Sequence, residues 1–106
     1  PLDCTAPDVA SFTTVEVGQT LSGQVEIRGV AGGVDFRRYH LDIRPDGYLR
    51  AVPILSGNTP VNGRVLGLLE TSGLPTGLAW LRLTIITGAG TMTDGQVCAI
   101  PVIIAR

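Results

Sequence analysis

The chain has 106 residues, of which 44% are hydrophobic, 16% charged and 5% aromatic, and its basic residues, all arginine, number eight against nine acidic ones. This size and composition predict one small globular domain over residues 1–106. The charge balance offers no basic surface for nucleic acid, and no apolar run approaches the roughly 20 residues that cross a bilayer, so we expect neither a nucleic-acid partner nor a membrane span.

The sequence consists of short apolar or alternating runs, and clusters of Gly, Pro, Asn and Asp separate them. This pattern is typical of an all-β sandwich or barrel, here with about seven strands and no helix. Residues 8–14 are expected to form a first edge strand, and a second strand covers about residues 21–30. In that strand Val25 and Ile27 point one way and Glu26 the other, as in a half-buried antiparallel strand.

Residues 36–44 alternate in the same way and predict a third strand. The segment 44–47 (Arg-Pro-Asp-Gly) predicts a turn, because Pro fixes φ at its first position and Gly accepts a positive φ. This turn should close a hairpin onto residues 48–55. The side chains of the third strand expected in the core are Tyr39, Leu41 and Ile43.

The second half of the chain continues the pattern. Further strands are expected at residues 64–71, 78–86 and 96–105, with a loop over 56–63 and a corner over 72–77. The last strand is apolar on both faces. It contains Pro101, which cannot donate to a ladder and therefore belongs on an edge or at a bulge.

The chain holds two cysteines, Cys4 and Cys98, with no CxxC spacing and one histidine elsewhere, so neither a zinc site nor thioredoxin-like chemistry is supported. We expect a disulfide between them, which implies an oxidising compartment. Two buried free thiols in a cytosolic domain are the alternative.

His40 and Asp42 share one face of a strand and form an incomplete ligand set, so we favour a solvated strand in which Arg38 and Arg44 pair with Asp42. The serines lack the G-x-S-x-G context of a hydrolase nucleophile, and nothing in the sequence places His40 beside one; they are Ser11, Ser22, Ser56 and Ser72. We therefore expect no enzymatic activity and no cofactor.

Two binding classes stay open. Calcium is a competitor because Asp35, Asp46 and Asp94 lie in or near loops, although no D-x-D-x-D-G spacing is present. Sugar binding would need several exposed aromatic side chains on one face, and some of the few aromatics must fill the core. We expect no metal site.

Four segments carry a family resemblance: residues 18–29 (GQTLSGQVEIRG), 39–42 (YHLD), 65–77 (VLGLLETSGLPTG) and 81–85 (LRLTI). They resemble a bacterial extracellular immunoglobulin-like or fibronectin type III-like module, of the kind appended to cell-wall enzymes such as penicillin-binding proteins and present in surface proteins. The resemblance runs from about Cys4 to Ile104. It implies an immunoglobulin-like antiparallel β-sandwich, secreted or anchored in the envelope, with a spacer, adhesive or assembly role and no catalytic residues.

The chain departs from that family in two places. The family reads LGTWDT where this chain has LGLLET (residues 66–71), and GTYTLRL where it has GLAWLRL (residues 77–83). In the family's register Leu78, Trp80, Arg82 and Thr84 face outward, opposite a core set of Ala79, Leu81, Leu83 and Ile85. Leu68 would then join Leu78 and Trp80 in an exposed apolar patch beside Arg82, as at a partner site. A register shifted by one residue would instead make Trp80 the core tryptophan.

These features predict a non-enzymatic structural domain of the bacterial exterior that associates with copies of itself or with other cell-surface proteins, as a subunit of a filament or pilus-like assembly. The last strand invites β-strand addition, and its candidate interface residues are Ile100, Val102 and Ile104. The alternative is an accessory spacer or adhesion module of a larger cell-wall enzyme or surface protein.

Overall fold

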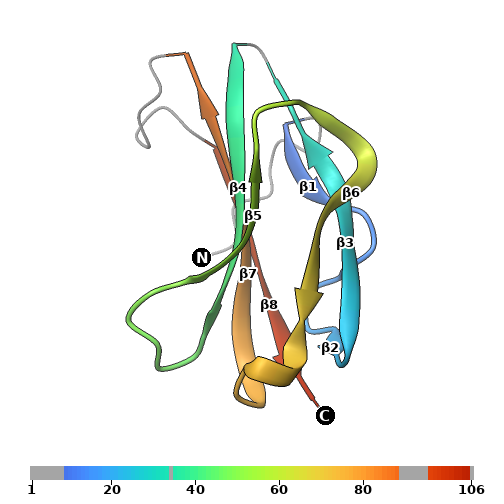
Figure 1. Cartoon of the computed structure of the whole chain (residues 1–106), viewed down its shortest axis with the longest axis vertical. Coiled ribbons are helices and arrows are strands. Elements are labelled where there is room, and N and C mark those ends of the chain that lie inside the picture. Colours follow the sequence, from blue (N-terminus) through green and yellow to red (C-terminus); the bar gives the residue numbers. More distant parts are fainter. Residues whose placement is uncertain (1–8, 34, 89–95, 106) are drawn as a thin grey trace.

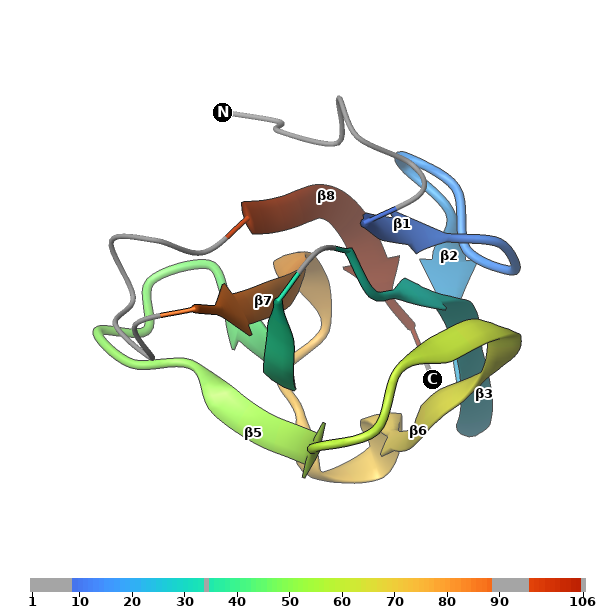
Figure 2. The same ribbon diagram turned by 90° about the horizontal axis from the view of Figure 1, so that it is seen from above.

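The computed structural model describes residues 9–33, 35–88 and 96–105. They form two β-sheets packed face to face, which confirms the expected all-β sandwich (Figures 1 and 2). The strands are β1 (Ala10–Phe12), β2 (Thr20–Leu21), β3 (Gln24–Ala31), β4 (Phe36–Pro45), β5 (Val52–Gly57), β6 (Val61–Glu70), β7 (Gly77–Thr87) and β8 (Gln96–Ile104). The helical structure in the described residues is a single 3-10 turn, η1 (Thr71–Gly73), so no helix there is long and apolar enough to cross a bilayer.

One sheet has three strands in the order β1-β3-β6, and the other has five in the order β2-β8-β7-β4-β5. Neighbouring strands are antiparallel except β2 and β8, which run parallel. The predicted strand over residues 21–30 is divided because Gly23, directly before β3, takes a φ of +67°. The chain therefore changes sheets between β2 and β3, which raises the strand count to eight in the described residues.

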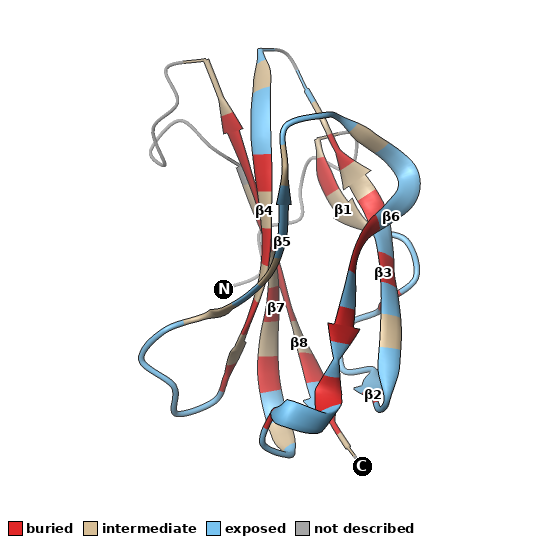
Figure 3. Ribbon diagram, in the orientation of Figure 1, coloured by how far each residue is buried: buried red, intermediate tan, exposed pale blue. Residues whose placement is uncertain are grey.

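Buried positions recur along the strands of both sheets (Figure 3), and their apolar side chains form one core cluster. The expected inward faces of β3, β4 and β7 are confirmed. Ile27 is fully buried between two exposed neighbours, Glu26 and Arg28. The largest fully buried side chains are Ile27, Leu41, Ile43, Leu66, Leu81, Leu83, Ile85, Val102 and Ile104.

The predicted hairpin between β4 and β5 forms, with a longer loop than expected. The Tyr48 amide donates to the Pro45 carbonyl at 3.0 Å and Gly47 has a φ of +89°, so the turn lies where the sequence indicates it. Val52 is the first strand residue of β5, and it packs against the core. Part of the predicted loop over residues 56–63 is strand, since β5 runs to Gly57 and β6 begins at Val61.

β8 lies between β7 and the short β2. The Pro101 carbonyl accepts from the Gly18 amide at 2.7 Å, and the Ile103 amide donates to the Gln19 carbonyl at 2.9 Å. The nitrogen and carbonyl of one strand residue point to the same side, so the Pro101 nitrogen also faces away from β7. The missing N–H of Pro101 therefore removes no hydrogen bond between β7 and β8.

Candidate interaction surface

The outer face of the five-stranded sheet carries the tryptophan. Trp80 stands between Arg44 of β4 and Pro101 of β8, and Leu78 pairs with Ile103. The alternate residues Ala79 and Leu81 are fully buried, so β7 has the register in which Leu78, Trp80 and Arg82 face outward. The shifted register, with Trp80 in the core, is excluded.

Leu78, Trp80, Pro101 and Ile103 are four neighbouring apolar side chains on this face, and we call them the Trp80 surface. Leu78 and Ile103 are 39% and 38% exposed, and Trp80 is half-buried. Thr84 differs from its expected exposure: it faces outward but is buried, because it lies on the central strand between His40 and Val97.

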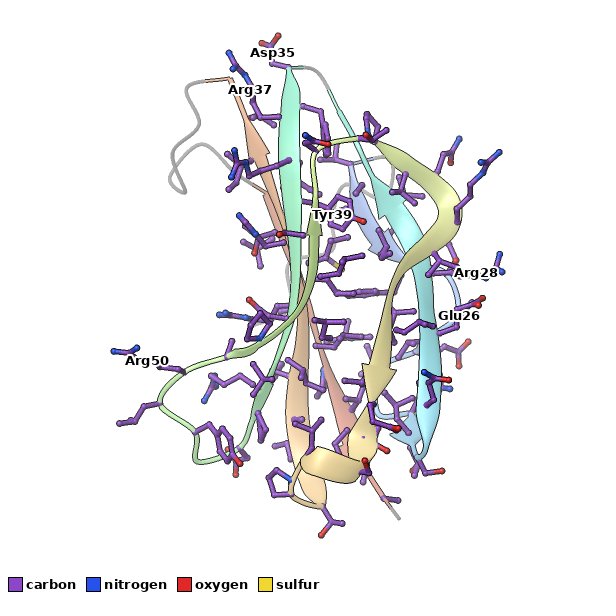
Figure 4. All side chains as sticks on the ribbon, viewed as in Figure 1. Glu26, Arg28, Asp35, Arg37, Tyr39 and Arg50 are labelled. Atoms are coloured by element: carbon purple, nitrogen blue, oxygen red, sulfur yellow. The ribbon has the colours of Figure 1, made fainter. Side chains whose placement is uncertain are left out.

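Leu68 does not belong to the Trp80 surface, which corrects the expected single patch. It lies on β6 in the other sheet, opposite Glu26, and is 55% exposed. Sequence parity identified it as outward-facing but could not show which sheet it would join. With Val65, which pairs with Arg28 on the same outer face, it forms what we call the Leu68 surface. Figure 4 shows Glu26 and Arg28 pointing away from the core on this side.

The three candidate interface residues of the last strand face the core. Ile100, Val102 and Ile104 are 5%, 0% and 1% exposed. They pair with inward-facing positions of β7, so the prediction that they form an exposed interface is wrong. The outward positions of β8 are the odd-numbered ones, of which Pro101 and Ile103 extend the Trp80 surface. Because both faces of this strand are apolar, its sequence does not indicate which positions face the core.

Arg82 lies beside the Trp80 surface and is bound to Asp42 of β4. Its Nε and Nη2 donate to the two carboxylate oxygens at 2.8 and 3.1 Å. This hydrogen bonding raises the pKa of Arg82 further above its ordinary value. The expected pairing of Asp42 with Arg38 and Arg44 is therefore replaced by Arg82, and Arg44 instead donates to the Tyr48 carbonyl at 3.1 Å.

The structure places Ser56 directly opposite His40 on neighbouring strands, which sequence reasoning did not foresee. In the described part of the chain no hydrogen bond joins these two side chains. Both oxygens of Asp42 are occupied by Arg82 and do not orient the imidazole. The arrangement therefore does not activate Ser56 as a nucleophile.

The aspartates considered for calcium are far apart. Asp35 directly precedes β4 and Asp46 directly follows it, so a ten-residue strand separates them, while Asp94 lies outside the described residues. Across residues 9–33, 35–88 and 96–105, no three metal-ligating side chains gather.

Cys98 lies on β8 with its side chain buried. Cys4 lies outside the described residues, so the disulfide stays a prediction.

A further exposed apolar site is the loop between β4 and β5. Leu49 is 99% exposed and Tyr48 is 43% exposed. The predicted strand over residues 48–55 includes both of them, whereas β5 begins at Val52, so their position in an exposed loop is a correction.

Comparisons with known proteins reveal a similarity of fold. No protein-family model matches the chain, and no curated protein does. Two solved structures are similar. One is an endo-β-1,4-mannanase from Thermotoga petrophila, with a TM-score of 0.67 and 17% identity over 96% of this chain. The other is an engineered protein, with a TM-score of 0.59 and 15% identity over 91% of this chain. The chain spans about a fifth of each of those chains, and at these identities the likeness shows the fold alone.

Proposed function

We propose that this chain is a non-enzymatic structural domain of the bacterial cell exterior that associates with copies of itself, as a subunit of a surface filament or pilus-like assembly. The observation that carries the proposal is the Trp80 surface. Its side chains lie together on a sheet face and include Leu78 and Ile103, both more than a third exposed. A contiguous exposed apolar patch on a small domain typically marks a contact with another protein.

The flat face of a sheet suits such a contact, because the face of another sandwich can pack against it. The Arg82–Asp42 pair borders the apolar side chains and has its hydrogen bonds satisfied within the chain. Its burial in an interface would therefore leave no carboxylate without a partner. An apolar centre with a polar border is the usual anatomy of a protein interface.

The test is electron microscopy and size-exclusion light scattering on the non-reduced protein across a range of concentrations. We expect ordered oligomers, and the fluorescence of Trp80, the single tryptophan, should become less accessible to acrylamide as they form. A strictly monomeric species at high concentration would contradict the proposal.

The proposed location is extracellular, with a disulfide between Cys4 and Cys98. The resemblance to secreted immunoglobulin-like modules supports this location, and so does the position of Cys98. It lines a groove with Phe12, the last residue of β1, and Val15 of the segment that follows. Four residues lie between Cys4 and Val9, the first residue that the structure describes, so a cross-link to Cys98 would have only a short length of chain to span.

A second function, an accessory module of a larger enzyme, is favoured by one specific observation. The fold of this chain recurs as about a fifth of the mannanase chain. A domain in that role holds a neighbouring domain at a distance or contacts polymer weakly, and needs no self-association. An open reading frame that joins this sequence to a catalytic domain, together with a monomeric protein, would support the module over the subunit.

A further inference from the structure

The two outer faces of the sandwich carry apolar side chains at the same end of the molecule. Leu68 is two residues before the end of β6, and Leu78 is the second residue of β7. A short connection through η1 joins these strands at the lower end of Figure 1. The Leu68 and Trp80 surfaces therefore lie at similar heights on opposite sides of the domain.

The charges beside these two surfaces are opposite in sign. On the Leu68 side, Glu26 is paired with Arg28, which leaves Glu70 as the uncompensated charge on that face of β6. Across the described residues no ion pair holds Glu70, and it is exposed.

On the Trp80 side the arrangement is reversed. Asp42 is paired with Arg82, which leaves Arg44 beside Trp80 with no carboxylate partner in the described ranges. Each surface thus combines an apolar centre with one ion pair formed within the chain and one charged side chain outside any ion pair of the described residues. That side chain is Glu70 on the Leu68 side and Arg44 on the Trp80 side.

We propose that copies of this chain stack head to tail, with the Leu68 surface of one copy packed on the Trp80 surface of the next and Glu70 placed near Arg44. The inference rests on the proposed self-association and adds its geometry. Two different surfaces that meet in this way form a heterologous contact. When the rotation that relates successive copies does not close a ring, repetition of this contact produces an open filament.

The symmetric alternative is less favourable. A dimer formed by two Trp80 surfaces would enclose two Arg44 side chains and supply a spare carboxylate to neither, and an excess of like charge opposes association. The head-to-tail contact pairs opposite charges instead. The molecule measures 39 × 27 × 21 Å, so a sheet face is comparable with the roughly 800 Å² that each partner buries in a standard interface.

Mixing two variants tests this geometry. Leu68→Glu disables one surface and Leu78→Glu the other, and both residues are exposed enough for the fold to tolerate the change. We expect each variant alone to be monomeric and their equimolar mixture to form a one-to-one dimer, because one intact surface of each kind remains. Wild-type protein should form long oligomers, and Leu49→Glu, at a fully exposed loop position, should behave like wild type.

Other outcomes have distinct meanings. Dimers of Leu68→Glu combined with monomers of Leu78→Glu would overturn the head-to-tail stack but leave self-association standing. Wild-type protein that stays monomeric would remove the proposed function itself. Circular dichroism and thermal unfolding check that each variant is folded, and Ile103→Glu replaces Leu78→Glu if the latter is not.

Charge reversal gives an independent check. Arg44→Glu and Glu70→Arg should each weaken assembly, by roughly tenfold for a like-charge contact, and the two changes in one chain should restore it. If the double variant is weaker than either single variant, Arg44 and Glu70 do not face each other between copies.

Discussion

At the scale of single residues, the tightest constraint in the described structure falls on Gly29. A Cβ atom placed there would lie 2.1 Å from the Ser11 carbonyl oxygen and 2.9 Å from the Leu66 side chain. The absent side chain allows β1 to lie directly against β3, since Ser11 and Phe12 belong to the strand paired with it. Any larger residue must displace that backbone.

Gly29→Ala should therefore destabilise the domain, by about 1–3 kcal/mol or more, because the clash involves backbone that cannot rotate away. Chemical denaturation measures the loss. Gly73→Ala is the matched control, since open space surrounds that position. Equal unfolding free energies for the two variants would show that β1 moves freely and that the close approach is not a constraint.

Tyr39 gives a prediction about pH. Burial raises the pKa of its phenol above the ordinary value of 10.0, and its hydroxyl donates to the Leu66 carbonyl at 3.2 Å. The folded state therefore keeps this proton longer than the unfolded state. The stability that this contributes is complete below pH 10 and declines as the pH rises through the raised pKa.

Ultraviolet titration of a Tyr48→Phe variant isolates Tyr39, because the chain has two tyrosines. We expect its ionisation above pH 10, and a fall in unfolding free energy over the same range that Tyr39→Phe does not show. Ionisation of Tyr39 below its ordinary pKa would contradict the effect of burial.

At the scale of elements, the change of sheet between β2 and β3 is held by η1. The Thr71 amide and hydroxyl both donate to the Gly23 carbonyl, at 3.0 and 2.9 Å. Thr71 is buried, so these bonds attach the β6–β7 connection to the point where the chain passes from one sheet to the other.

Thr71→Val keeps the shape of the side chain and removes the hydroxyl bond. The Gly23 carbonyl retains the amide bond, so we expect a loss of about 1 kcal/mol, near the typical net value of a hydrogen bond. Thr20→Val makes the same chemical change at an exposed position of β2 and is the control. A Thr71→Val protein as stable as wild type would show that the hydroxyl adds nothing to this junction.

The elements that the sequence predicts well are those with strict alternation. In β4 the apolar Tyr39, Leu41 and Ile43 alternate with polar residues, so one face had to be buried. The division at Gly23 was not predictable, because residues 21–30 read as one continuous strand. Which sheet receives each half depends on long-range pairing.

The same reasoning explains the candidate surface. The outward position of Trp80 is one of two registers that the sequence leaves open, and the resemblance to the family favours it. The burial of Ala79 and Leu81 decides between the two. β8 is apolar at nearly every position, so its sequence does not indicate which side chains face the core. Ile100, a predicted interface residue, is buried there. The separation of Leu68 from Trp80 needed the sheet order, which local pattern does not contain.

At the scale of the whole molecule, a disulfide between Cys4 and Cys98 would close a loop of 95 residues, nearly the entire chain. In the chain-entropy model such a loop stabilises the folded state by roughly 4 to 5 kcal/mol, because it restricts the unfolded chain. The bond would also anchor the segment before β1 to β8, whose outward residues Pro101 and Ile103 belong to the Trp80 surface. A filament exposed to the exterior would gain resistance to unfolding from this single cross-link.

We therefore expect no free thiol in denatured, non-reduced protein and two after reduction, with an unfolding free energy lower by up to about 4 to 5 kcal/mol in the reduced form. Denaturant is needed because Cys98 is 1% exposed. Cys4→Ser should match the reduced protein and be insensitive to reductant, which separates loss of the bond from other effects of reduction. Two thiols in the denatured, non-reduced protein would disprove the cross-link and weaken the case for an extracellular location. The proposed stacking of the two sheet faces uses neither cysteine, so the mixing of the two variants tests it independently.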